Sequence, residues 1–187
     1  MSMIAIVFHS GYGHTEVQAR AVARGVARTG TPRLVPVHQI EDHWDALAAA
    51  DGLAFGAPTY MGSASAPFKA FMDASAARVW SAQRWRDKPA AGFTTSAWPS
   101  GDKLQTLVQL ALFAMQHGMI WIGLDQLPVD GEAAPNRLGA WLGAMGRNRH
   151  GEAAPSEGDL ASSEHLGARL ARVADELRRG RAAGGGA

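Results

Sequence analysis

The residues with the clearest chemical potential form a short polar loop near the amino end of the chain. The stretch Ser10–Thr15 lies between an apolar run, residues 3–8, and a helical pattern that begins at Glu16. The first turn of a helix has unpaired N–H groups and a partial positive charge, and a phosphate satisfies both. Hydroxyls and glycines in the loop add donors and let the backbone approach closely. The loop predicts a phosphate site, and the alternative is an ordinary helix cap made by Thr15 with Gln18.

The composition of this loop indicates what kind of phosphate it suits. It contains no Lys or Arg, so it lacks the lysine of a P-loop, and it does not follow the G-x-G-x-x-G pattern of dinucleotide folds. A neutral cradle favours the phosphate monoester of a permanently bound cofactor over a nucleotide that turns over. The chain has no cysteine, which excludes thiol catalysis, disulfides and iron–sulfur ligation. Any redox chemistry therefore belongs to a borrowed cofactor. No His, Asp or Glu spacing suggests a metal site.

Composition limits the remaining possibilities. The 187 residues suit one domain, expected over residues 1–180, and the 18 basic and 17 acidic side chains nearly cancel. That balance favours neither a nucleic acid nor a membrane surface as partner. The sequence shows no secretory signal, and its apolar runs fall far short of the ~20 residues needed to cross a bilayer. We expect a cytoplasmic protein.

Short apolar runs alternate with helical patterns along the chain. The runs are residues 3–8, 34–37, 52–57, 89–95 and 119–124. Most of them lack polar alternation, as expected for parallel strands that are covered on both faces. Helices are predicted over residues 66–80, on the pattern Leu104, Leu107, Val108, Ala111, Leu112 and Met115, and at residues 166–177 with a stop at Gly180. Residues 181–187 are expected to be disordered. This alternation predicts a doubly wound α/β sheet.

Ligands of such sheets bind at the carboxyl ends of the strands. The third and fourth runs lead into residues 56–62 and 94–101, which are rich in small, hydroxylated and aromatic side chains. Together with the first loop they should form one site. The long segment 124–157 is expected to pack against another subunit, because a solvated loop would not carry so much apolar surface. Its apolar residues are Leu127, Leu138, Trp141, Leu142 and Met145.

These motifs resemble those of the flavodoxin superfamily. More closely, Ser10–Thr15, Phe55–Thr59 with Gly62, and His117–Met119 resemble the tryptophan-repressor-binding-protein type of NAD(P)H:quinone oxidoreductase. The resemblance covers roughly residues 1 to 125. It implies a three-layer sandwich with a five-stranded parallel sheet of order 2-1-3-4-5 and helices on both faces. It also implies FMN as cofactor, NAD(P)H as co-substrate, and a homodimer or homotetramer.

The resemblance assigns roles to individual residues. The FMN phosphate falls to the first loop, the flavin ring to the second, and the polar edge of the flavin to the third. The positions are Ser10, Gly11, Tyr12, Gly13, His14 and Thr15 for the phosphate; Pro58, Thr59, Tyr60, Met61 and Gly62 for the ring; and Thr95, Ser96, Ala97, Trp98 and Ser100 for the polar edge. His117 is implied to reach the cofactor and is the one candidate catalytic residue. Tyr12, Trp80 and Trp98 are candidates for the substrate cleft.

The chain departs from the family at two of these loops. Tyr60 and Met61 stand where the family has Arg and Phe, and the third loop contains Trp98-Pro99 in place of several glycines. Two assignments also have a simpler alternative. His117 ends a helix, where it could complement the helix dipole, and Trp80 could be a packing residue. Asp102 and Lys103 are interpreted as ordinary first-turn helix residues.

The resemblance implies transfer of a hydride from NAD(P)H to FMN, followed by transfer of two electrons to a quinone. The alternatives are a one-electron carrier of the flavodoxin type and a module that binds FMN without turnover. A net charge of +1 gives little of the steering that such carriers use to dock on protein partners, which favours the reductase. A serine hydrolase is excluded because the chain has no G-x-S-x-G elbow.

Overall fold

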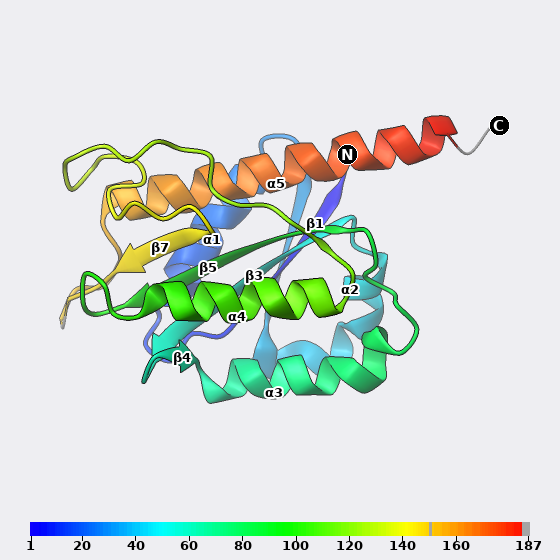
Figure 1. The fold of residues 1–187 in the computed structure, drawn as a ribbon, viewed down its shortest axis with the longest axis horizontal. Coiled ribbons are helices and arrows are strands. Elements are labelled where there is room, and N and C mark those ends of the chain that lie inside the picture. Colours follow the sequence, from blue (N-terminus) through cyan, green and yellow to red (C-terminus); the bar gives the residue numbers. More distant parts are fainter. Residues whose placement is uncertain (150, 185–187) are drawn as a thin grey trace.

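The computed structural model describes residues 1–149 and 151–184 and shows alternating strands and helices (Figure 1). The strands are β1 (Met3–Phe8), β2 (Thr31–Pro36), β3 (Gly52–Tyr60), β4 (Ser63–Ala64), β5 (Pro89–Ser96), β6 (Ile120–Trp121) and β7 (Ala144–Arg147). The helices are α1 (His14–Val26), α2 (Trp44–Ala49), α3 (Ala66–Ser75), α4 (Lys103–Gln116) and α5 (Glu157–Gly184), with a 3-10 helix at Val37–Asp42 and a π-helix at Ala76–Trp80. Within the described residues, no helix is long and apolar enough to span a membrane.

The main strands pair in parallel in the order β2-β1-β3-β5-β6, which confirms the predicted order and fold class. The fifth position differs from the prediction because two short strands share it. β6 pairs with the start of β5 at Pro89 and Ala90, and β7 pairs with its end, Phe93–Ser96. Between them the chain leaves the sheet over residues 122–143. Gly143 permits its return, because a Cβ there would collide with the carbonyl oxygen of Gly92.

Helices cover both faces of the sheet and enclose two cores. α1 and α5 pack together on one face and bury Val22, Leu166 and Leu170. Their backbones approach closely at Gly25 and Gly167, where any Cβ would collide with a carbonyl oxygen of the other helix. This contact holds α1, the helix that follows the predicted phosphate loop, firmly against the sheet.

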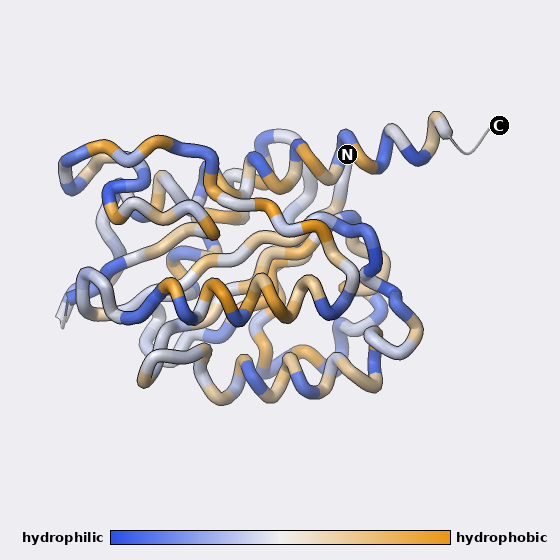
Figure 2. The backbone as a smooth tube through the Cα atoms, viewed as in Figure 1, coloured by the Kyte–Doolittle hydropathy of each residue, from blue (hydrophilic) through white to orange (hydrophobic). Residues whose placement is uncertain are grey.

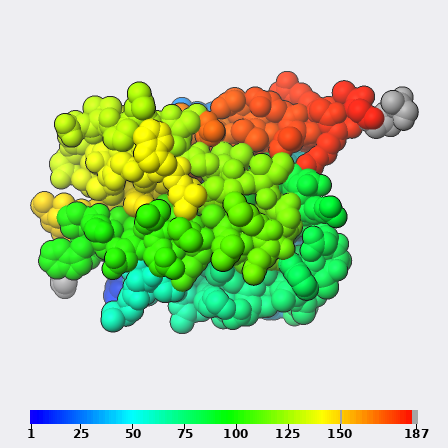
Figure 3. Space-filling model, viewed as in Figure 1, coloured from blue at the N-terminus to red at the C-terminus, as the bar shows by residue number. Residues whose placement is uncertain are grey.

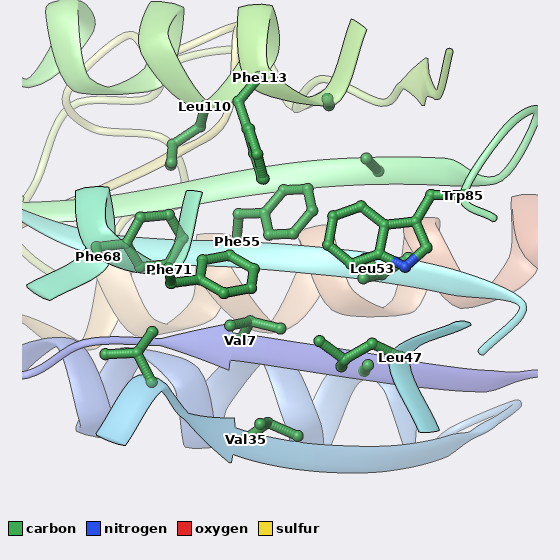
Figure 4. Packing of buried hydrophobic residues seen from close by; sticks show 14 of the residues in the cluster. Val7, Val35, Leu47, Leu53, Phe55, Phe68, Phe71, Trp85, Leu110 and Phe113 are labelled. Atoms are coloured by element: carbon green, nitrogen blue, oxygen red, sulfur yellow. The ribbon is translucent and has the colours of Figure 1, made fainter. Parts of the chain in front are cut away.

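The other face is covered by α2, α3 and α4 over an aromatic core (Figure 4). Phe55 of β3 lies 5.3 Å from Phe113 of α4, between ring centroids, and 6.0 Å from the fully buried Trp85. Phe71 of α3 contacts all three rings. Such edge-to-face and tilted pairs add to the stabilisation from burial, so this core fixes α3 and α4 relative to β3.

The predicted apolar pattern of α4 does not all face the core. The helix buries Leu107, Leu110 and Phe113 against the sheet. A second apolar stripe, the α4 stripe, is 41–59% exposed and consists of Leu104, Val108, Leu112 and Met115. Orange stretches along α4 in Figure 2 reflect this second face. The helix is apolar on two sides because the sheet covers only one of them.

A groove of about 1020 Å³ lies beside this stripe. Leu104 and Val108 form one wall, and residues 138–142 with Met145 form the other. In Figure 3 the yellow segment around residue 140 lies beside the green surface of α4. Of the apolar residues singled out in segment 124–157, Leu127 and Trp141 are exposed, whereas Leu138, Leu142 and Met145 are half-buried.

Helix α5 extends past the expected stop at Gly180. It continues to Gly184, so the first four residues of the predicted disordered tail are helical. Asp175 accepts hydrogen bonds from Arg178 and Arg179 one turn later, and Arg181 donates to the carbonyl of Asp87. These contacts support the helix around Gly180, a glycine where an added Cβ would meet no neighbouring atom. Residues 185–187 of the predicted tail lie outside the described residues.

Candidate functional site

The predicted phosphate loop joins β1 to α1 as expected. Gly13 has φ 88°, a left-handed conformation that favours glycine, and α1 begins at the next residue. Ser10 Oγ accepts a hydrogen bond from the N–H of Glu16 at 3.1 Å. Gly13, the residue that precedes the helix, has no side chain to cap it, and Ser10 occupies only the N–H of Glu16, so the N–H groups of His14 and Thr15 are left for an oxygen ligand.

The alternative helix cap at Thr15 does not form. Thr15 lies inside the first turn, and its Oγ1 is 3.0 Å from Thr95 Oγ1 at the end of β5. The side-chain amide of Gln18 donates to the carbonyl of Ala144 on β7 at 3.3 Å. Both side chains tie α1 to other strands, so the loop is not an ordinary capping box.

A second set of threonines connects the ends of β3 and β5. Thr59 Oγ1 lies 2.8 Å from both Thr94 Oγ1 and Thr106 Oγ1, and all three residues are buried. Hydroxyls can donate and accept at once, so this chain of hydrogen bonds is internally satisfied. It fixes the carboxyl ends of these two neighbouring strands, where the second and third predicted loops begin.

A pocket of about 730 Å³ opens where these loops meet. The structure brings together most of the predicted cofactor residues around it. They are Ser10, Gly11, Tyr12, His14, Thr15, Pro58, Thr59, Tyr60, Thr95, Ser96 and Ala97. Gly11 lies under the ring of Tyr60, and a Cβ there would lie 2.6 Å from Tyr60 Oη. Tyr12 and Tyr60 form an edge-on pair with ring centroids 6.1 Å apart.

Other predicted residues lie beside the pocket and do not line it. Met61 and Gly62 form the tip of the β3–β4 hairpin with φ 49° and 78°, and the Met61 side chain is fully exposed. Trp98 follows the pocket residue Ala97 and is 74% exposed. Ser100 lines the groove beside α4. Gly13 shapes the phosphate loop through its backbone.

Sequence analysis missed a fourth wall, which follows β7. It consists of Asn148, Arg149, Gly151, Glu152 and Ala153. The carbonyl of Glu152 lies 2.8 Å from Nε2 of His14, so this wall is attached to the phosphate loop. Asn148 donates its backbone N–H to the carbonyl of Ser96 at 3.1 Å. β7 is short and lies in a Gly- and Ala-rich segment, so no apolar run marked its end as a site.

Within one chain, the structure places His117 away from this pocket. α4 runs from the carboxyl end of β5 back to the amino end, where β6 pairs with Pro89, and His117 follows that end of the helix. His117 is buried against Trp85, with ring centroids 4.4 Å apart, and its Nε2 lies 3.0 Å from Ser75 Oγ. Burial lowers its pKa to about 4.

Trp80 lies near His117 and also away from the pocket. Its Nε1 donates to the carbonyl of Gln116 at 2.8 Å, and both residues line a separate cavity of about 360 Å³. The predicted substrate role of Trp80 therefore finds no support within one chain. Its ring is partly exposed and lies against the end of α4.

Lys103 is not an ordinary first-turn residue. Its side chain is fully buried, and Nζ donates to Ser96 Oγ at 3.0 Å, to the carbonyl of Trp98 at 2.8 Å and to that of Pro99 at 2.9 Å. Burial lowers its pKa to about 8. The pattern of a lysine beside a helix start gave no signal of this role. No group of three or more His, Asp or Glu able to hold a metal occurs among residues 1–149 and 151–184.

A doubly wound sheet with a neutral phosphate loop after its first strand defines the flavodoxin superfamily. A family model described as NADPH-dependent FMN reductase matches residues 27–134. The chain belongs to this family. The match confirms the predicted resemblance, the enzyme class of flavin-dependent oxidoreductase, and FMN with NAD(P)H as electron donor.

Individual relatives resemble the chain over nearly its whole length. "Flavodoxin FldP" of Pseudomonas aeruginosa is 40% identical, over 95% of this chain and 99% of its own. An Archaeoglobus fulgidus protein named NAD(P)H dehydrogenase (quinone) is 31% identical, over 95% of this chain and 100% of its own. The crystal structure of a flavodoxin, WrbA-like protein from Agrobacterium tumefaciens is 39% identical, with a TM-score of 0.77 over 94% of this chain and 99% of that one.

Proposed function

We propose that the 730 Å³ pocket binds FMN and that the protein oxidises NAD(P)H and reduces a quinone-type acceptor there. Bound FMN would accept a hydride from NAD(P)H and pass two electrons to the quinone. The observation that carries the proposal is the neutral hydroxyl-and-glycine loop at the start of α1, which opens into a pocket of cofactor size.

The residues present fit FMN on two walls of the pocket. The start of α1, with Ser10 and Thr15, suits the phosphate. On the wall that follows β7, Asn148 is 3% exposed, and neither polar atom of its amide has a partner within the described residues. A buried amide without partners is costly, so a polar ligand in this pocket would relieve it. Tyr12 and Trp98 stand exposed at the rim, where flat substrates can stack.

Binding and turnover test the proposal directly. Purified protein should bind FMN with micromolar or better affinity, as measured by quenching of flavin fluorescence. It should also reduce benzoquinone with NADH or NADPH. Tight binding of FAD with no measurable affinity for FMN would overturn it.

The main alternative is a one-electron carrier, supported by the Pseudomonas relative that is named a flavodoxin. A carrier would bind FMN but would not oxidise NAD(P)H by itself. An FMN-loaded protein that exchanges electrons with a redox partner and shows no NAD(P)H oxidation would establish the carrier. Loaded protein inactive in both assays would indicate a binding module.

The steady-state kinetics should show that NAD(P)H and quinone use the same face of the flavin ring. If the two substrates take turns over that face, double-reciprocal plots give parallel lines. Trp98→Ala should change the quinone KM or kcat and leave FMN affinity within about tenfold, since Trp98 lies beside the pocket without lining it and the phosphate loop is untouched. Arg172→Ala, on the exposed side of α5 and outside both the pocket and the α4 stripe, is the control and should leave the kinetics unchanged. Intersecting lines would instead indicate a ternary complex.

We also propose that the protein is a homodimer or homotetramer, assembled through the α4 stripe and the segment around Trp141. Contiguous exposed apolar surface of this kind is typical of subunit interfaces. Leu112→Asp should convert the oligomer to a monomer, as measured by light scattering at tens of micromolar. Arg172→Asp, on the exposed side of α5, is the control and should leave the assembly intact. A monomeric wild type would contradict the proposal.

A further inference from the structure

The loop between β5 and α4 is built around the buried ammonium group of Lys103. All three hydrogen-bond donors of the ammonium are used, and all three acceptors belong to this loop: Ser96 Oγ and the carbonyls of Trp98 and Pro99. The turn that returns the chain to Lys103 needs two consecutive left-handed residues, Gly101 and Asp102, both with φ 53°. A Cβ at Gly101 would collide with Ser96 Oγ. The loop is therefore shaped closely around this one cation.

A buried cation is costly unless it is paired, and Lys103 has no ion pair within 4.0 Å among the described residues. The acid that raises the pKa of Lys103 is Asp159 of α5, whose carboxylate pairs with Arg137 at 2.9 Å. Carbonyl and hydroxyl oxygens satisfy the donors of Lys103 but do not cancel its charge. A structural role alone would be met at lower cost by a neutral donor, so the charge itself requires an explanation.

The position of this charge supplies the explanation. Ser96 lines the cofactor pocket, and its Oγ accepts from Lys103 Nζ at 3.0 Å, so the ammonium lies one hydrogen bond behind the pocket wall. Among the described residues, the two charged side chains that line the pocket, Arg149 and Glu152, are of opposite sign. Lys103 thus adds a buried positive charge directly behind Ser96, and no carboxylate in the part of the chain that the structure describes is bonded to it.

We propose that Lys103 is a positioning residue of the cofactor site that fixes the 96–99 wall and places a positive charge behind it, which stabilises reduced FMN relative to oxidised FMN. The inference rests on the proposed function, since it takes FMN as the ligand. Reduced flavin can carry negative charge whereas oxidised flavin is neutral, so a fixed cation at short range favours the reduced form. Such tuning suits a protein that must accept electrons from NAD(P)H readily.

The lowered pKa of Lys103 makes this effect depend on pH. Burial is the largest cause, Asp159 opposes it, and Arg147 of β7 and Arg137 act in the same direction as burial. Because the pKa is about 8, the ammonium is charged below that pH and loses its proton above it. The preference for reduced FMN should therefore be full well below pH 8 and decline as the pH rises through 8.

The test compares the dissociation constants of oxidised and reduced FMN in wild type, Lys103→Met and Lys103→Arg. Lys103→Met should reduce the preference for the reduced form about tenfold, which is about 30 mV in the midpoint potential of a two-electron couple. Lys103→Arg should restore most of it. The difference between wild type and Lys103→Met should be present at pH 7 and should shrink progressively as the pH rises through 8 and beyond, which a merely structural role would not produce.

The outcomes separate this inference from the proposed function. If wild type binds no FMN, the proposed function fails. If wild type binds FMN and Lys103→Met weakens both redox forms equally, Lys103 only shapes the loop and the charge inference is overturned. Lys103→Gln keeps a donor without the charge, and wild-type behaviour in this variant would also overturn it. If Lys103→Met does not fold, the redox preference of wild type is compared with that of Lys103→Gln over the same pH range. A preference that declines with pH in wild type but not in Lys103→Gln supports the inference, and the same pH dependence in both overturns it.

Discussion

Replacing Ser10 or Thr15 by alanine is expected to weaken FMN binding about 10- to 150-fold and to affect riboflavin far less. Hydrogen bonds to charged groups contribute ~1.5–3 kcal/mol. Ser10 Oγ already accepts from the N–H of Glu16, which leaves its hydrogen free to donate to phosphate. Thr15 can likewise donate outward while it accepts from Thr95. Since riboflavin lacks the phosphate, it gains nothing from either hydroxyl.

Titration of each variant with FMN and with riboflavin measures the effect. Thr106→Val is the matched control, because its hydroxyl takes part in a similar buried bond, 2.8 Å from Thr59 Oγ1, but does not line the pocket. It should lower stability and leave the ratio of the two affinities unchanged. Equal losses of FMN and riboflavin at Ser10 and Thr15 would mean that this loop does not hold the phosphate.

Acid should destabilise the fold through His117. Its pKa is about 4 in the folded chain, below the ordinary value of 6.5, because burial opposes the charged form. The unfolded chain therefore binds a proton between these pH values that the folded chain does not. The contribution of His117 to the free energy of unfolding is fully present above pH 6.5 and is lost as the pH falls toward 4. The total loss is about 3 kcal/mol.

Denaturant unfolding at pH 7 and pH 4.5 tests this expectation. His117→Gln keeps a polar group that can hydrogen-bond Ser75 but does not titrate. On acidification, this variant should therefore lose less stability than wild type, and the difference should be most of the loss attributed to His117. His38→Gln, at an exposed histidine, is the control and should retain the wild-type loss. An identical loss in wild type and His117→Gln would show that another group governs acid stability.

The sheet could be predicted because its strands are marked twice, by apolar composition and by the polar residues that end them. Pro89–Thr95 shows both signals and is found as β5. The fifth strand was predicted less well, since only Ile120 and Trp121 of the run 119–124 pair as β6. The remainder of that edge is supplied by β7, four residues with no run of large apolar side chains, so pattern alone could not reveal it.

The site was predictable to the extent that topology decides it. Loops that follow parallel strands must meet at one edge, and Ser10, Pro58 and Thr95 do line one pocket. The same rule argues against His117, because a residue that ends a crossover helix lies at the opposite edge. The role of Lys103 depends on which way a side chain turns within a loop, and a single sequence does not carry that information.

The divided edge beside β5 has a consequence for how such proteins can diversify. Residues 122–143 leave the sheet at β6 and rejoin the same edge at β7, so both ends of the excursion are anchored to one strand. A graft or deletion in its exposed stretch, residues 127–131, changes neither strand order nor the direction in which the chain re-enters. Evolution, or a protein engineer, can therefore remodel the outer surface of the molecule while Asn148 and the wall that follows it keep their place.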